Sequence, residues 1–214
     1  MIELFYSPTP NGKKISIMLE EAKIDYKITL VNLGKDEQLK PEFLKINPYG
    51  KIPAIRDYEN DLILIESGAI LIYLAKKSNQ FLPQENETRI FEWLMFQISN
   101  VGPNLGQLHH FSHFNPGKSL YSEERFYKAT VRVYAALDNQ LKKKNYIAGE
   151  EYSIADIALF PWVARHDWHM PERTNLKDNY KFLVDWYERV SSRPAVIKGY
   201  DCLNNGEKIP GIEL

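Results

Sequence analysis

The feature that most constrains the fold is a pair of short segments, residues 51–55 and 65–70. The first is an apolar run that contains Pro53, and the second places Glu66 and Ser67 directly before a strongly apolar stretch. Proline does not donate to a β-ladder, so Pro53 predicts a strand end or a turn, with a cis bond as one option. A helix that begins at Ser67 would offer free amides and the positive end of its dipole to an anion. Together the two segments predict a site for a small peptide that carries a carboxylate.

Composition removes several classes of function. The chain has 214 residues, 44% of them hydrophobic, and a formal charge of −1, so neither nucleic acid nor an anionic membrane is an expected partner. Its single cysteine, Cys202, excludes an internal disulfide and any paired-cysteine redox or zinc motif. The first residues lack a basic segment before a long apolar run, and no stretch approaches the roughly 18 apolar residues of a membrane span. We therefore expect a cytoplasmic protein.

The first 77 residues predict an α/β domain. Strands are expected at residues 2–6, 26–31, 52–56 and 62–65, and helices at 15–22 and 69–75, with a short helical turn from Pro41. Pro8, Pro10 and the Asn11–Gly12 pair are expected to form a turn after the first strand. The order of elements, βαβ and then ββα, indicates a mixed sheet.

The pattern changes after residue 77. Residues 78–87 are polar, contain Pro83 and read as a linker, and residues 88–214 carry helical stripes that end in an irregular polar tail. Ser153 and Asp156 have the spacing of a capping box, in which each side chain satisfies a backbone amide at a helix start. We therefore expect an all-helical second domain.

These features together resemble the glutathione S-transferase family over nearly the whole chain. Residues 6–14, 47–53 and 102–107 are most similar to its bacterial nu class and to the fungal relatives of the yeast nitrogen-regulating prion protein. The resemblance implies a thioredoxin-like first domain, an all-α second domain, a homodimer and glutathione as co-substrate. It also implies that glutathione is used for disulfide chemistry more than for conjugation.

The resemblance assigns roles to particular residues. Pro53 would be cis, and the Ile52 backbone would pair with the cysteinyl part of glutathione as an added strand. Glu66 and Ser67 would hold the γ-glutamyl group, and Lys51 and Gln38 would contact the glycyl end. The alternatives are a strand-terminating turn at Pro53, an ordinary helix cap at residues 66–67 and a solvated lysine at position 51.

The sulfur is expected at the end of the first strand. Among the side chains there, the nu-type pattern favours Thr9 and Asn11 as sulfur contacts ahead of Ser7 and of Tyr6, which strand alternation directs to the core. The alternative is ordinary turn chemistry. Asn104 and Arg132 are expected on two long helices that line the cleft. Arg132 would receive a second glutathione, or the first one across a dimer, and its alternative is a solvated helix arginine.

The resulting hypothesis is a glutathione-dependent disulfide-bond reductase that draws both thiols from glutathione. A transferase that conjugates small electrophiles and a non-catalytic glutathione-binding regulator are the alternatives. No metal is expected, because His109, His110 and His113 lack the glutamate of the metalloprotease motif.

Overall fold

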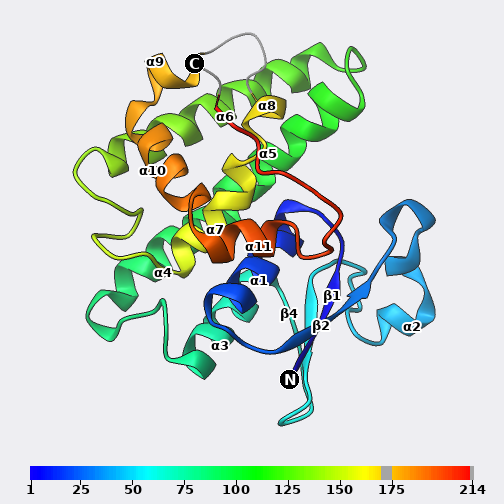
Figure 1. Ribbon diagram of the computed structural model, residues 1–214. Coiled ribbons are helices and arrows are strands. Elements are labelled where there is room, and N and C mark those ends of the chain that lie inside the picture. Colours follow the sequence, from blue (N-terminus) through cyan, green and yellow to red (C-terminus); the bar gives the residue numbers. More distant parts are fainter. Residues whose placement is uncertain (170–174, 213–214) are drawn as a thin grey trace. The chain divides into compact units, whose positions relative to one another are not determined.

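A computed structural model describes residues 1–169 and 175–212. The chain forms two compact units: Met1–Leu82 with Pro194–Lys208, and Pro83–Arg193 with Ile209–Leu214. In Figure 1 the first unit includes the blue and cyan elements and the orange helix α11 (Pro194–Tyr200). The sequence-based division follows chain order, whereas the units follow packing, so residues 194–208 group with the first unit. None of the helices in the described ranges is both long and apolar enough to cross a membrane.

Unit 1 is built on the expected mixed four-stranded sheet. Its strands are β1 (Ile2–Tyr6), β2 (Tyr26–Leu30), β3 (Ala54–Asp57) and β4 (Leu62–Ile65), in the order β2-β1-β3-β4. β1 pairs parallel with β2, and the other two pairings are antiparallel. All five residues of β1 are buried, because both faces of this central strand are covered.

Different helices cover the two faces of the sheet. The Tyr6 ring lies against Gly12 in α1 (Pro10–Glu21), and α1 packs on α3 (Ser67–Ser78). On the other face Phe5 and Phe43, the latter from the short helix α2 (Pro41–Leu44), meet edge to face with ring centroids 6.1 Å apart. Their cluster also contains Val31 and Ala54. This α/β arrangement confirms the predicted class of the first domain.

The start of α1 corrects one sequence-based expectation. Residues 10–12 were expected to form a turn, but they are the first turn of the helix, with Pro10 at its beginning. Proline is well suited to that position, because the first amide of a helix has no partner inside the helix. Gly12 is needed for close packing, since a Cβ there would lie 2.2 Å from the Ser7 carbonyl oxygen.

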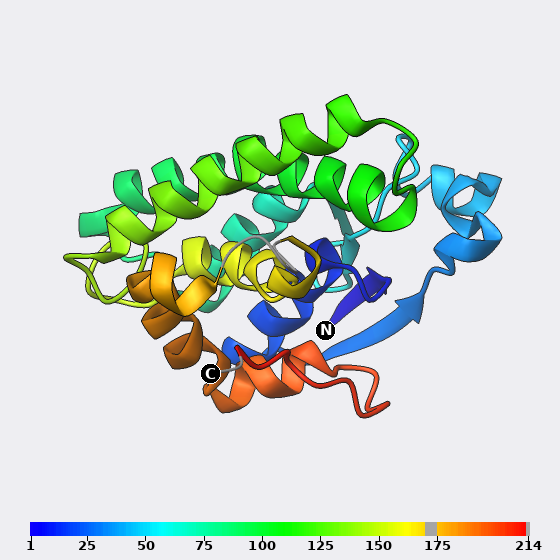
Figure 2. The same cartoon turned by 90° about the horizontal axis from the view of Figure 1, so that it is seen from above.

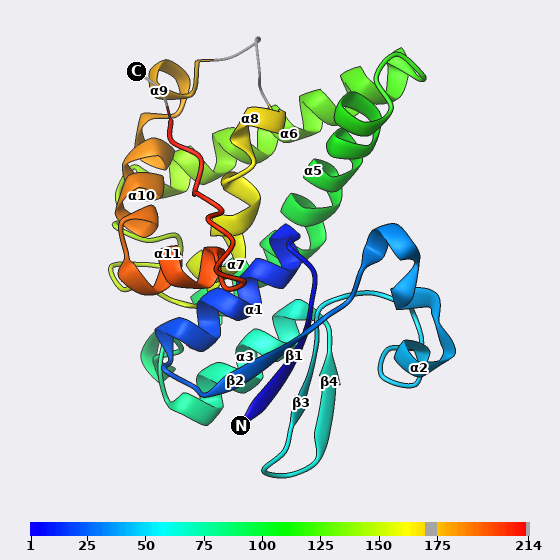
Figure 3. The ribbon, with the colours of Figure 1, turned by 45° about the vertical axis from the view of Figure 1, so that its right-hand side comes forward.

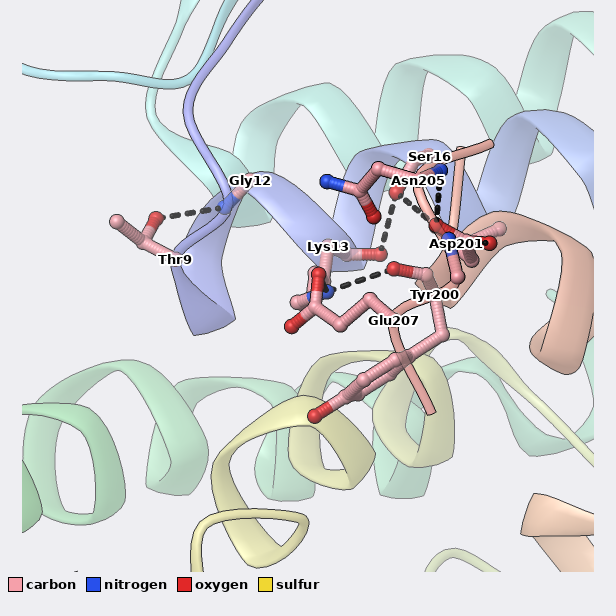
Figure 4. A network of polar contacts seen from close by, with 10 residues as sticks. Thr9, Gly12, Lys13, Ser16, Tyr200, Asp201, Asn205 and Glu207 are labelled. Carbon is pink, nitrogen blue, oxygen red and sulfur yellow. Dashed lines mark hydrogen bonds and ion pairs between the residues drawn. The ribbon is translucent and has the colours of Figure 1, made fainter. Parts of the chain in front are cut away.

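The segment that follows the helical region in sequence returns to α1. Gly199 in α11 faces the Ile17 backbone, and the Ser16 hydroxyl donates to the Gly199 carbonyl at 2.6 Å. Figure 4 shows how Lys13 reaches the residues beyond α11: its ammonium donates to the Tyr200 carbonyl at 2.6 Å and to the Glu207 carboxylate at 2.7 Å. The tail is therefore irregular, as predicted, yet tied to α1 by specific contacts.

The secondary-structure elements of unit 2 are helices in the part of the chain that the structure describes, apart from an isolated bridge between Tyr146 and Gly149. Its helices are α4 (Glu87–Phe96), α5 (Gly102–Leu108), α6 (Leu120–Leu141), α7 (Ile154–Val163), α8 (His166–His169), α9 (Leu176–Asn179) and α10 (Lys181–Ser191). π-helical turns at Gln97–Val101 and His109–Phe114 join α4 to α5 and extend α5. α5 and α6 lie side by side in Figures 1 and 2. Pro103 has no backbone N–H to donate to the preceding turn of a regular helix. The π turn before it is where the regular hydrogen-bond pattern is interrupted.

The core of unit 2 centres on α7, all ten residues of which are buried. The predicted capping box is confirmed at its start, where Ser153 caps the helix and Asp156 accepts from the Ser153 N–H at 3.0 Å. Asp156 also accepts from the Ile147 N–H and the Trp186 indole N–H, each at 2.9 Å. One buried carboxylate therefore ties α7 to the preceding loop and to α10.

Candidate functional site

The strand register brings the candidate residues of unit 1 to one end of the sheet. Phe5 pairs with Ala54, and Ala54 pairs with Ile65, so the chain beyond β1, before β3 and after β4 meets at this end. The parallel pairing of Tyr6 with Leu30 adds the segment after β2. In Figure 3 the turn between β3 and β4 lies at the opposite end of the sheet. Thr9, Asn11, Gln38, Lys51, Ile52, Pro53, Glu66 and Ser67 all lie on or follow these four segments.

Thr9 is the N-cap of α1. Its backbone is extended (φ −104°, ψ 161°), and its hydroxyl oxygen accepts from the Gly12 N–H at 3.2 Å (Figure 4). A hydroxyl has a single hydrogen, so Thr9 keeps a donor while its oxygen caps the helix. Thr9 and Asn11 are both half-buried at the positive end of a twelve-residue helix. This position suits a group that develops negative charge.

The Ile52–Pro53 peptide bond is cis. β3 pairs only from Ala54 onward, which leaves Ile52 outside the ladder beside β1 and β4. The approach to this bond is fixed by buried Asn47, whose amide donates to the Lys51 carbonyl at 2.7 Å and whose side-chain oxygen accepts from the Tyr49 N–H at 3.0 Å. The segment before β3 is thus held in an extended form next to the end of β1.

Ser67 is not an ordinary helix cap. It is the first residue of α3, the cap position belongs to Glu66, and neither side chain makes a capping hydrogen bond. Glu66 is exposed and has φ 68° and ψ 112°, a backbone conformation that costs of order 1–3 kcal/mol in a residue with a side chain. The Ser67 hydroxyl accepts from the ammonium of buried Lys14 at 3.2 Å. Strained backbone conformations cluster at functional sites, so Glu66 is a candidate on this ground.

Gln38 and Lys51 differ in their surroundings. Gln38 lies in the 3-10 helix Glu37–Leu39, where its amide donates to Asp36 at 3.4 Å. The side-chain oxygen of Gln38 is buried and has no hydrogen-bond partner among the described residues. Lys51 is exposed, and its ammonium lies 5.6 Å from the centre of the Tyr49 ring. Lys51 is therefore accessible as a flexible cation. The side-chain oxygen of Gln38 is able to accept a hydrogen bond from a ligand.

Asn104 and Arg132 belong to unit 2. Asn104 lies in α5 and donates to the Asn100 carbonyl one turn earlier at 2.7 Å. Arg132 is an exposed residue of α6. α5 and α6 pack on each other, so the two residues lie on adjacent helices, the first of which begins after a π turn. Such turns occur often at functional positions.

Two buried histidines of unit 2, His109 and His169, are hydrogen-bonded in series with Tyr134. The Nε2 atoms of His109 and His169 are 2.6 Å apart, and His169 Nδ1 is 2.8 Å from the Tyr134 hydroxyl oxygen. Burial lowers the pKa of His109 to about 4, with the nearby Arg165 and His113 adding to the effect. The described residues contain no cluster of three or more His, Cys, Asp or Glu side chains that could hold a metal. These hydrogen bonds fit a packing role for the neutral rings of His109 and His169.

Cys202 is not on any of the four segments that carry the candidate residues of unit 1. It follows α11, and its thiol contacts the Tyr6 hydroxyl and Ser16. Burial raises the pKa of the Cys202 thiol, although the contacts with Tyr6 and Ser16 oppose the shift. The Tyr6 side chain is 1% exposed and points to Cys202, as expected for a residue that faces the core. Neither group is a reactive anion at neutral pH.

Two residues of this end of the sheet were not among the sequence-based candidates. Lys14 and Asn47 belong to the segments 6–14 and 47–53 that carry the family resemblance, but neither was given a role there. No local sequence signal marks Lys14, which precedes Ile15 in α1. Neither its complete burial nor its contact with Ser67, 53 residues away in the chain, follows from local spacing.

Comparisons with known proteins agree with this geometry. Residues 9–77 match the N-terminal domain of glutathione S-transferase, and residues 103–194 match its C-terminal domain. The chain is 46% identical over 202 residues to the disulfide-bond oxidoreductase YfcG of Escherichia coli, covering 91% of this chain and 92% of that protein.

Two solved structures have the same fold. A glutathione transferase from Burkholderia graminis with two glutathione molecules bound per subunit superposes with a TM-score of 0.90 at 38% identity, covering 96% of this chain and 89% of that one. A glutathione transferase from Pseudomonas putida with one glutathione disulfide per subunit gives 0.83 at 38%, covering 98% and 92%. The family matches and these likenesses confirm the predicted architecture, and the chain belongs to the glutathione S-transferase family.

Proposed function

We propose that the protein is a glutathione-dependent disulfide-bond reductase in which glutathione supplies both reacting thiols. The observation that carries this proposal is the position of its single cysteine. Cys202 lies after α11 with its thiol against Tyr6 and Ser16, whereas the polar groups suited to a peptide ligand lie on the segments that meet at the end of the sheet. The name of the Escherichia coli relative and the glutathione disulfide in the Pseudomonas putida structure support the same chemistry.

Glutathione would bind along the end of the sheet. The Ile52 backbone would pair with its cysteinyl residue as an added strand, with the cis Pro53 bond setting the direction of the segment. Ser67 and the amides at the start of α3 would receive the γ-glutamyl carboxylate, and Glu66 would accept from the α-amino group. These groups lie just before β3 and just after β4, on segments that the sheet register brings to the same end.

The glycyl end of glutathione would lie toward Lys51 and Gln38. The Lys51 ammonium would pair with the glycyl carboxylate from an exposed, flexible side chain. The buried oxygen of Gln38 would accept a hydrogen bond from the ligand backbone, which would satisfy the atom that has no partner among the described residues.

The sulfur would lie at the start of α1. Only the thiolate is a good nucleophile, and Thr9 and Asn11 would stabilise it through the hydroxyl hydrogen of Thr9, the side-chain amide of Asn11 and the helix dipole. The Thr9 oxygen already accepts from Gly12, which directs its hydrogen to another acceptor. This arrangement lowers the pKa of a bound thiol without any protein nucleophile.

The reaction then proceeds by two exchanges. The bound thiolate attacks one sulfur of the substrate disulfide, forms a mixed disulfide with glutathione and releases the other substrate sulfur as a thiolate. A second glutathione thiolate attacks the glutathione sulfur of that mixed disulfide, which gives glutathione disulfide and releases the remaining substrate thiolate. Two glutathione molecules lose two electrons in total, and the substrate disulfide gains them.

The second glutathione is assigned to unit 2. Asn104 would donate to it, and the Arg132 guanidinium would receive one of its carboxylates, or one from the first glutathione across a dimer. The two glutathione molecules per subunit in the Burkholderia graminis structure support a site for a second molecule.

A cytoplasmic homodimer is the expected setting. The proposed reaction consumes reduced glutathione, and the cytoplasm keeps glutathione in that reduced form. α4 exposes Met95, which is 48% accessible, and α6 exposes Tyr121, which is 76% accessible, so apolar surface is present for a subunit interface. Sedimentation of the purified protein tests the dimer, and fractionation of its host cells tests the location.

The decisive assay is turnover of 2-hydroxyethyl disulfide with glutathione, coupled to glutathione reductase. We expect clear turnover in the wild type and a loss of about tenfold or more in Asn11→Ala, because one donor at the sulfur is removed. Asn60→Ala, in the turn at the opposite end of the sheet, is the matched control. A wild-type rate no higher than the uncatalysed one would contradict the reductase, and assays with 1-chloro-2,4-dinitrobenzene and bound glutathione would then separate conjugation from simple binding.

A further inference from the structure

The chain at the end of α11 and beyond it forms a strap, residues 200–207, that lies against α1. The strap is ordered by its own contacts, because the Asp201 carboxylate accepts from the N–H groups of Asn205 and Gly206, each at 3.0 Å. Gly206 has φ 83°, a conformation that suits glycine. These hydrogen bonds close a loop that delivers Glu207 to a defined position beside α1 (Figure 4).

Glu207 meets a buried cation of α1. The Lys13 side chain is 1% exposed, and its ammonium pairs with the Glu207 carboxylate at 2.7 Å. The same ammonium donates to the Tyr200 carbonyl at 2.6 Å and lies 3.7 Å from the centre of the Tyr200 ring. A buried charge is tolerated only where such partners surround it. Displacement of the strap would therefore separate the Lys13 charge from its carboxylate partner.

Lys13 lies one helical turn from the groups assigned to the glutathione sulfur. Its N–H donates to the Thr9 carbonyl at 2.9 Å, which closes the first turn of α1. The Thr9 hydroxyl oxygen caps the same turn, and Asn11 lies within it. A shift of Lys13 is therefore passed to both sulfur donors through a single turn of helix.

Charge and packing both join this part of α1 to the chain around α11. The start of a helix carries partial positive charge, which disfavours a lysine and favours a carboxylate. Glu207 supplies that carboxylate from 194 residues further along the chain. Beyond Lys13, the Ser16 hydroxyl donates to the Gly199 carbonyl at 2.6 Å, and Gly199 fits closely against the Ile17 backbone. The strap and α11 thus hold the half of α1 that begins at the sulfur donors.

We propose that Glu207 is a positioning residue for the sulfur site: its ion pair with Lys13 holds the start of α1 where the sulfur donors meet the thiolate. This inference rests on the proposed function, because it takes Thr9 and Asn11 as the sulfur contacts. Displacement of such donors by about 1 Å is enough to weaken their effect on a developing charge. Loss of the ion pair should therefore lower the thiolate fraction of bound glutathione and kcat. The segments next to β3 and β4 should still bind the rest of the ligand.

The test is Glu207→Gln, which keeps the size of the side chain and an acceptor oxygen but removes the charge. Ultraviolet absorbance of the thiolate at neutral pH measures the ionised fraction of bound glutathione, and turnover of 2-hydroxyethyl disulfide gives kcat. We expect each to fall about threefold or more. Calorimetric titration with S-methylglutathione, which has no thiol, should give an affinity within about twofold of the wild type.

Glu20→Gln is the matched control. Glu20 also joins α1 to α11 through an ion pair, with Lys198 at 2.8 Å, but it lies near the far end of α1. Its loss should lower stability and leave the thiolate fraction unchanged. Lys13→Met and Glu207→Gln should combine non-additively in the thiolate fraction, because each removes half of one ion pair. If Glu207→Gln does not fold, the double variant, which leaves neither charge of the pair behind, should show the same loss.

The outcomes separate this inference from the proposed function. A wild type that binds glutathione as the thiolate, with the same thiolate fraction in Glu207→Gln, overturns the role of Glu207 and leaves the proposed function intact. Additive effects of the two substitutions do the same. An equal loss in Glu20→Gln also overturns it, since reduced stability alone would then disturb the site. Wild-type protein that binds no glutathione thiolate contradicts both.

Discussion

At the scale of single residues, the candidate site is made of groups that serve the fold and the chemistry together. Thr9 caps α1 with its oxygen and retains a hydrogen for a ligand. Glu66 has a strained backbone conformation and connects the end of β4 to the start of α3. These groups serve both the fold and the proposed contacts with the ligand. Substitutions should therefore change both stability and activity, and the two changes can be measured separately.

Thr9 gives the first prediction. Thr9→Val should reduce kcat/KM for 2-hydroxyethyl disulfide by about tenfold to a hundredfold and cost about 1 kcal/mol of folding free energy, because it removes both the donor and the cap. Thr9→Ser, which keeps the hydroxyl, should remain close to the wild type in both. Steady-state kinetics and urea denaturation measure the two effects. A Thr9→Val enzyme with full activity would remove Thr9 from the sulfur site.

The second prediction concerns the backbone strain at Glu66. Glu66→Gly should raise the free energy of unfolding by about 1 kcal/mol relative to Glu66→Ala, because glycine adopts φ 68° without a steric cost. Both variants should bind glutathione more weakly than the wild type, since each loses the acceptor for the α-amino group. Thermal unfolding and calorimetric titration test this pair. Equal stability of the two variants would argue against backbone strain at this position.

The elements that carry these residues can be predicted from the sequence, but their surroundings cannot. The proline before β3 and the acid–serine pair at α3 could be recognised because local spacing specifies them. The burial of Lys14 could not, since its contact with Ser67 arises only from the packing of α1 on α3. Residues 10–12 were misread for a related reason: proline and Asn–Gly indicate a turn, and the Thr9 cap converts them into a helix start.

At the scale of elements, β3 is tied to α3 by a buried carboxylate. Asp57 accepts from the Tyr73 hydroxyl at 2.6 Å, from the Lys77 ammonium at 2.8 Å and from the Glu59 N–H at 3.0 Å. Burial alone would raise the pKa of Asp57, but these donors lower it to about 2. The shift links this connection to the stability of the whole unit at low pH.

The third prediction follows from the sign of that shift. The folded pKa lies below the unfolded one, so the stabilisation is present above about pH 4 and is lost as the pH falls through about 2. Asp57→Asn should therefore be less stable than the wild type by about 2 kcal/mol at pH 7, with the difference shrinking toward pH 2. Denaturation curves over this range test it, and a difference that does not depend on pH would contradict it.

The capping box of α7 gives the fourth prediction. Ser153→Ala should cost about 1 kcal/mol, the usual value for a lost cap. Asp156→Ala should cost about 3 kcal/mol or more, because it leaves the buried donors of Ile147 and Trp186 unsatisfied as well. Chemical denaturation of the two single variants tests this order. Equal costs would mean that the contacts beyond the cap contribute nothing.

At the scale of the whole molecule, the boundary between Leu82 and Pro83 falls within the polar segment 78–87, but residues 194–208 group with unit 1 against the order of the chain. The linker and helical segment could be predicted from composition, because polar and apolar patterns differ there. The return of residues 194–208 to unit 1 could not, since it depends on Gly199 fitting against Ile17 and on Lys13 reaching Glu207. Such long-range contacts leave no periodic pattern in the sequence.

The position of Cys202 in that returning segment leads to the last prediction. If both thiols come from glutathione, Cys202→Ser should turn over 2-hydroxyethyl disulfide at a rate within about twofold of the wild type, because its thiol is protonated and contacts Tyr6. Mass spectrometry of the wild type during turnover should find no glutathione attached to Cys202. Asn11→Ala, assayed in parallel, gives the turnover rate expected when a contact to the glutathione sulfur is lost. Loss of turnover in a folded Cys202→Ser protein would place a protein thiol in the reaction and contradict the two-glutathione scheme.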